Sequence, residues 1–190
     1  MELRTYDGKN FEKVDYTEKA ATSREFHDCT FIQCNFSGSN FSGSKFIDCT
    51  FTSCNLSLVK FDQATLRNVT FKDCKILGVN FHECSAFLFS VSFEGCMLDF
   101  ASFAGRKMAK TSFIKCSLKE TSFMQAILTG SKFDQCNLLG TIFNRTDLSN
   151  CNFVTAYNYQ IDPEINKLNK ASFAEHGLAG LLFKYGIKVV

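Results

Sequence analysis

Apolar residues recur at every fifth position through most of the chain. Every fifth residue from Phe31 to Phe81 is apolar, and the same spacing, shifted by two residues, runs from Leu88 to Phe153. A looser version of the first register reaches back to Phe11. We call these positions centres, and 17 of the 22 phenylalanines stand on them. An α-helix repeats every 3.6 residues and a strand every two, so a period of five predicts an internal repeat.

A small residue stands two places before most centres, and polar residues flank the centre. The clearest examples are CNFSG at 34–38, SNFSG at 39–43, CNLLG at 136–140 and TDLSN at 146–150. These segments resemble the pentapeptide repeat family, over roughly residues 11 to 157. The resemblance implies an all-β solenoid, a right-handed quadrilateral β-helix with one pentapeptide on each side and four in each coil.

Coils of 20 residues would stack centres that are 20 apart, and the centres do sort in this way. One predicted face carries Phe41, Phe61, Phe81, Phe103, Phe123 and Phe143, and the opposite face carries Phe31, Phe51, Phe71, Phe93, Phe113, Phe133 and Phe153. The two faces between them are mostly aliphatic, with Leu56, Ile76, Leu98, Leu118 and Leu138 on one and Leu66, Leu88, Met108, Leu128 and Leu148 on the other. Aromatic rings on two sides and aliphatics on the others would fill a narrow core.

The sorting places two extra residues in a single irregular coil near residues 84–92. One side of that coil is expected to bulge outward, and the pattern leaves open whether Phe87 and Phe89 point inward or outward. Because an interruption in a smooth wall is a better anchor than repeat surface, the candidate partner-binding loop is Ala86, Phe87, Leu88, Phe89 and Ser90.

The ten cysteines follow the same period. Nine precede a centre by two residues, namely Cys29, Cys34, Cys49, Cys54, Cys74, Cys96, Cys116, Cys136 and Cys151, and Cys84 precedes Ala86. A free thiol is a small hydrophobe that suits an inward site too tight for leucine. The two C-x4-C pairs in 29–54 have a spacing that the repeat itself generates, so we predict reduced structural cysteines, without disulfides, metal or cofactor.

The five-residue pattern is predicted to end after Phe153. The chain therefore divides into a β-helix at 1–157 and a C-terminal helical cap and dimerisation tail at 158–190. Asp162 as N-cap and Pro163 at the first helical position predict a helix start. The candidate dimer interface is Leu178, Leu181, Leu182, Phe183, Ile187 and Val189, because resemblance to the quinolone-resistance type of the family implies a homodimer joined through this tail.

Catalytic chemistry has little support in the sequence. His27, His82 and His176 lie at unrelated places, no nucleophile is paired with them, and there is no glycine-rich phosphate loop. We therefore expect a protein that is not an enzyme. The absence of an apolar run that could serve as a signal or membrane anchor predicts a cytoplasmic protein.

The resemblance to the quinolone-resistance type implies binding to DNA gyrase or topoisomerase IV, but the charge points away from duplex mimicry. Residues 1–157 contain 17 Lys and Arg against 16 Asp and Glu. A duplex mimic needs dense negative charge. A solenoid with an unrelated protein partner is the alternative. Direct nucleic-acid binding would rest on Arg106, Lys107 and Lys110 alone, and we do not expect it.

Overall fold

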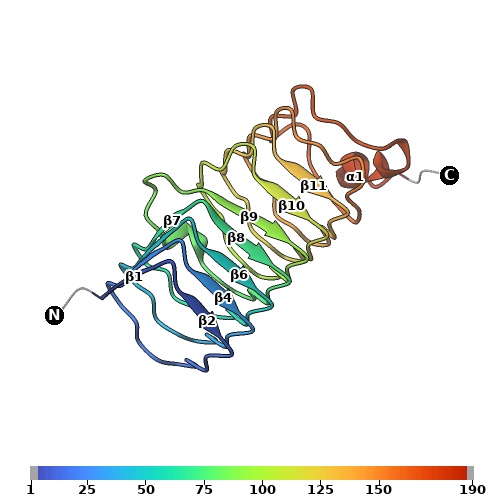
Figure 1. The fold of residues 1–190 in the computed structure, drawn as a ribbon. Coiled ribbons are helices and arrows are strands. Elements are labelled where there is room, and N and C mark those ends of the chain that lie inside the picture. The colour runs from blue at the N-terminus through green and yellow to red at the C-terminus, as the bar shows by residue number, and fades with distance from the viewer. Residues whose placement is uncertain (1–3, 188–190) are drawn as a thin grey trace.

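Each five-residue unit of the chain forms one straight side and one corner. The computed structural model describes residues 4–187 (Figure 1). Two residues after a centre the backbone usually turns with a positive φ, at glycines such as Gly38 and at 22 other residues such as Lys110 and Glu120. None of those 22 residues is Val, Ile or Thr, because a branched Cβ is the least tolerated in this conformation.

Two parallel sheets form where the sides are most extended. The seven-stranded sheet has the order β11-β10-β9-β8-β6-β4-β2, and the four-stranded sheet has the order β1-β3-β5-β7. The first contains β2 (Asn10–Glu12), β4 (Thr30–Ile32), β6 (Thr50–Thr52), β8 (Val69–Lys72), β9 (Val91–Glu94), β10 (Ser112–Ile114) and β11 (Lys132–Asp134). The second contains β1 (Thr5–Asp7), β3 (Glu25–His27), β5 (Lys45–Ile47) and β7 (Thr65–Arg67).

The pairing register confirms the predicted coil length and the predicted shift. Thr30 pairs with Thr50 and Thr50 with Thr70, an offset of 20 residues, whereas Val69 pairs with Val91, an offset of 22. The other two faces are joined by isolated bridges such as Asn35 with Asn55. The molecule is thus the predicted quadrilateral β-helix, drawn in Figure 1 as a rod of stacked coils.

The core is built from stacked rings. Along the seven-stranded face the rings from Phe11 to Phe173 form one continuous stack, with centroids 4.5–5.4 Å apart. Rings from the opposite face meet this stack edge-to-face, as Phe113 and Phe123 do at 5.6 Å. Both predicted phenylalanine columns are therefore confirmed, and their rings fill the core from two sides.

All ten cysteines are free and buried. Eight of the thiols lie against backbone carbonyls of the preceding coil, and Cys54 Sγ, for example, is 3.4 Å from the carbonyl oxygen of Phe31. Burial raises the pKa of Cys49, Cys84 and Cys151 to about 12. Within residues 4–187 no three His, Cys, Asp or Glu side chains form a group that could hold a metal ion.

Thiol titration checks this burial. At pH 8 a thiol with a pKa near 12, such as that of Cys49, Cys84 or Cys151, is ionised in only about one molecule in ten thousand, and only the thiolate attacks a disulfide reagent. The other thiols are shielded from the reagent by their burial. We expect the native protein to react with almost no reagent and the denatured protein to show all ten thiols. Rapid native labelling of several cysteines would contradict the inward placement.

The C-terminus departs from the expectation in two ways. The repeat does not end after Phe153, since Lys167 pairs with Asp147 and the ring of Phe173 stacks on Phe153 at 5.1 Å. The helix predicted from Asp162 and Pro163 is wrong. The chain turns there instead, and Asp162 Oδ1 accepts a hydrogen bond from the Glu164 backbone N–H at 2.9 Å. An Asp–Pro pair serves a turn as readily as a helix start.

The helical segments are short and come later. They are η2 (Glu175–Gly177), α1 (Ala179–Leu182) and η3 (Phe183–Tyr185), following η1 (Phe81–Glu83) in the irregular coil. No helix in the described part of the chain is long and apolar enough to cross a membrane.

Candidate functional site

The irregular coil replaces one rung of the four-stranded sheet with a loop. The backbone N–H of Ser85 donates to the carbonyl of Ala64, and that of Ser90 donates to the carbonyl of Leu66. Between these two hydrogen bonds the irregular coil has four residues, 86–89, whereas the coil below has only Thr65. The sheet ends at β7, and the loop projects from the side of the rod (Figure 1).

The loop sends one aromatic side chain out and one in. Phe87 is 72% exposed and Leu88 is 53% exposed, whereas Phe89 is only 9% exposed and joins the core. The expectation that Leu88 is an inward centre is therefore wrong, because Phe89 fills the missing side and Leu88 turns the corner with a φ of 54°. Ala86 and Ser90 are exposed on either side.

A buried arginine holds this arrangement. Arg106 stands two residues before the centre Met108, where most coils have a small residue and the N-terminal coil has Arg24, and it is only 7% exposed. Its Nη2 donates to the backbone carbonyls of His82 and Cys84. Its guanidinium carbon lies 5.2 Å from the centroid of the Phe89 ring. The loop is thus fixed from beneath by charged hydrogen bonds and a cation–π contact.

The sequence places Arg106 with Lys107 and Lys110 in a possible basic surface cluster. That placement is wrong for Arg106, which is buried. Lys107 and Lys110 are exposed, but the guanidinium between the coils faces the protein interior. Sequence reasoning missed the role of Arg106. The available signal was its place two residues before a centre, where most coils have a small residue.

The tail residues of the predicted dimer interface have different environments. Leu178, Phe183 and Ile187 are 45%, 43% and 58% exposed, so three apolar side chains face outward at this end of the rod. Leu181 packs against the core, and Leu182 is half-buried. Val189 lies outside the described residues.

The tail is fastened to the last coil by close packing and by an ion pair. Lys184 Nζ is 2.7 Å from Asp162 Oδ1, and the hydrogen bond from Lys184 lowers the pKa of Asp162. The Ile161 backbone N–H donates to the Gly180 carbonyl at 3.0 Å. A Cβ at Gly180 would lie 2.3 Å from the carbonyl oxygen of Tyr159, which leaves no room for a side chain.

We expect Gly180→Ala to loosen the tail. The added methyl group would overlap the Tyr159 backbone, and the tail must shift to make room for it. We expect this to destabilise the docked tail by about 1–3 kcal/mol. Limited proteolysis should then cleave the variant within the last 15 or so residues faster than the parent. Ala179→Ser, at an exposed neighbour, is the matched control and should behave as the parent. Equal cleavage of the two variants would contradict the docking contact.

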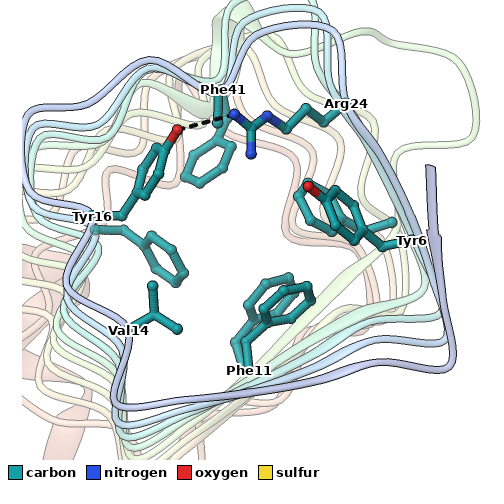
Figure 2. Close-up of a pocket in the computed structure, with 10 residues that line it drawn as sticks. Tyr6, Phe11, Val14, Tyr16, Arg24 and Phe41 are labelled. Atoms are coloured by element: carbon teal, nitrogen blue, oxygen red, sulfur yellow. Dashed lines mark hydrogen bonds between the residues drawn. The ribbon is translucent and has the colours of Figure 1, made fainter. Parts of the chain in front are cut away.

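The N-terminal end of the rod is open. Figure 2 shows Tyr6, Phe11, Val14 and Tyr16 around an apolar hollow of about 110 Å³ at this end. Arg24 Nη2 donates to the Tyr16 hydroxyl at 3.0 Å across its rim. The hollow is the end of the core column, left uncovered by the described residues.

The histidines do not assemble a catalytic group. His27 is half-buried beside Glu25 at 3.6 Å, and His82 is exposed beside Glu83 at 2.9 Å. His176 lies on η2 in the tail. The three histidines therefore lie at separate places, as the sequence indicates.

Comparisons with known proteins identify the repeat. A family model described as a pentapeptide repeat region matches residues 24–103, and a second, described as pentapeptide repeats, matches residues 121–156. Together the two matches cover more than half of the chain. No curated protein sequence matched it.

Two solved structures of QnrB1, described as a plasmid-mediated fluoroquinolone resistance protein, share the fold. A trypsin-treated variant gives a TM-score of 0.59 at 18% identity and covers 100% of both chains. The full-length protein gives a TM-score of 0.57 at 18% identity and covers 96% of this chain and 100% of its own. At this identity the likeness is one of fold.

Proposed function

The chain belongs to the pentapeptide repeat family, and we propose that it is a non-enzymatic protein-binding β-helix. The observation that carries this proposal is the outward pair Phe87 and Leu88 on a loop that Phe89 and Arg106 hold in place. A rigid loop that presents large apolar side chains has the character of a binding anchor, because little conformational entropy is lost on docking.

We further propose a type II topoisomerase, DNA gyrase or topoisomerase IV, as the partner, with protection from quinolones as the outcome. The support is the fold shared with QnrB1 over the whole length of both chains. This proposal places the protein in the cytoplasm, where these enzymes act on DNA.

Near-neutral charge shapes how such protection would work. The DNA-binding channel of a topoisomerase is suited to the negative charge of phosphates. A rod with balanced charge therefore cannot replace a duplex along its length. We therefore propose a local contact through Ala86, Phe87, Leu88 and Ser90. The same charge balance favours the alternative function, a scaffold for an unrelated protein partner.

The proposed active form is a homodimer joined through the C-terminal tail. Leu178, Phe183 and Ile187 supply the apolar surface, and a second copy would cover it. Sedimentation equilibrium tests this proposal, with Phe183→Ser as the variant. A monomer at micromolar concentration in the parent protein would refute it.

The function is tested by gyrase supercoiling with a fluoroquinolone and increasing amounts of the protein. The expected result is recovery of supercoiling at equimolar to tenfold excess of the protein over gyrase. A parallel reaction without the drug separates protection from inhibition. No recovery with either gyrase or topoisomerase IV would exclude the topoisomerase proposal and leave the unrelated partner.

A further inference from the structure

A hollow of about 300 Å³ lies beneath the irregular loop, beside the buried arginine. Its lining includes His82, Phe89, Gly105, Arg106 and Lys107, which come from two successive coils. The loop covers it on one side because Phe89 turns inward. The hollow is large enough for a small oxyanion and its waters.

In the described part of the chain Arg106 forms no ion pair, although Asp62 and Glu83 lie near Cys84, whose carbonyl it contacts. Among residues 4–187, no carboxylate lies within ion-pair distance of its guanidinium. Glu83, a neighbouring acid, pairs with His82 instead at 2.9 Å. Two backbone carbonyls and the Phe89 ring solvate the cation only in part, and a buried charge without a counter-charge is costly.

Arg106 lines the hollow and keeps unused hydrogen-bond donors. In the described structure the hydrogen bonds of Arg106 all come from Nη2, so Nε and Nη1 keep their donors. Such a planar edge matches the two oxygens of a carboxylate or phosphate. Lys107 adds a second cation at the exposed rim, and a Cβ at Gly105 would meet nothing within 4 Å, so the backbone there is open to approach.

We propose that this hollow is an anion-binding site that takes one carboxylate or phosphate group, with Arg106 as the principal ligand and Lys107 as the second. The Arg106 guanidinium is pre-positioned by its two carbonyl contacts, so binding needs no rearrangement of the loop. An arginine inside the rod, at a position that most coils give to a small residue, departs from the repeat pattern, as residues at functional sites do. Arg24 holds the equivalent position at the open N-terminal end. The inference is independent of the identity of the protein partner.

The test is an NMR titration of the five arginine side chains in the full chain. Inorganic phosphate and acetate are the two probes, each added at constant ionic strength with chloride as the balancing anion. We expect a saturable shift of the Arg106 Nε–H signal with at least one probe, while exposed Arg145 responds weakly and without saturation. A response to phosphate alone would assign a phosphate group, and a response to acetate alone would assign a carboxylate.

Lys107→Ala is expected to weaken the response of Arg106 about three- to tenfold, and its fold should be intact because Lys107 is exposed. Lys110→Ala, which removes an exposed lysine outside the lining, is the matched control and should leave the affinity unchanged. The proposal is overturned if Arg106 shows no saturable shift with either anion, or if Lys107→Ala and Lys110→Ala have the same effect.

Discussion

Phe123→Ala is expected to destabilise the protein by about 3–5 kcal/mol. Phe123 is 0% exposed, stacks on Phe103 and Phe143, and meets Phe113 and Phe133 edge-to-face. Truncation leaves a cavity in the middle of a ring column, where neighbouring coils cannot collapse because the backbone ladder fixes their spacing. Denaturant midpoints would measure the loss, which is a large part of the total stability of a typical domain.

Two control variants test whether the loss of stability depends on the buried position of Phe123 within the core. Gln125→Ala changes an outward corner residue two places along the chain and should cost little. Phe11→Ala removes the same ring from the half-buried end of a column and should cost clearly less than Phe123→Ala. If the three variants lost similar stability, the assignment of inward faces would be wrong.

Removing the two outward side chains of the loop is expected to abolish most partner binding. On the proposed function, the double variant Phe87→Ala and Leu88→Ala should weaken the gyrase complex about 30-fold or more, because each truncation removes an exposed apolar anchor. Its thermal unfolding should match the parent, since Phe89 and Arg106 still hold the loop. Binding would be measured by surface plasmon resonance and function by drug-protected supercoiling.

The matched control is Phe100→Ala. Phe100 is 59% exposed at a corner outside the loop, so its truncation removes a comparable apolar surface elsewhere on the rod. If Phe100→Ala reduced protection and the loop variant did not, the contact surface would lie at that corner. If neither variant changed the affinity, the apolar loop would have no part in binding.

The stacked core was predictable from sequence because each inward position is repeated many times. A column such as Phe31, Phe51 and Phe71 can be recognised even if one of its positions is assigned wrongly. The parallel pairing of the strands confirms the register of this column. Cysteine placement followed for the same reason. Nine of the ten cysteines occupy a small inward site that the period defines twice, by the centre after it and by the coil below.

The irregular coil was predictable as a location and not as a conformation. Where the period breaks, no neighbouring repeat indicates which of Phe87, Leu88 and Phe89 turns inward. The answer depends on Arg106, which is 17 residues away from Phe89 in sequence and stacks on its ring in space. At the tail, Asp162 and Pro163 carry a signal shared by turns and helix starts, and the packing of the following coil decides between them.

The loop interrupts one sheet, yet both ring columns pass through the same coil without a gap. Phe71 stacks on Phe93 at 5.2 Å, and Phe81 stacks on Phe103 at 4.7 Å, across the inserted residues. Three sides of the coil therefore hold it to its neighbours. The fourth side is free to vary in length and composition. This corner is a natural acceptor for foreign peptides, so that epitopes or alternative recognition loops could be grafted between Ser85 and Phe89 without redesign of the scaffold.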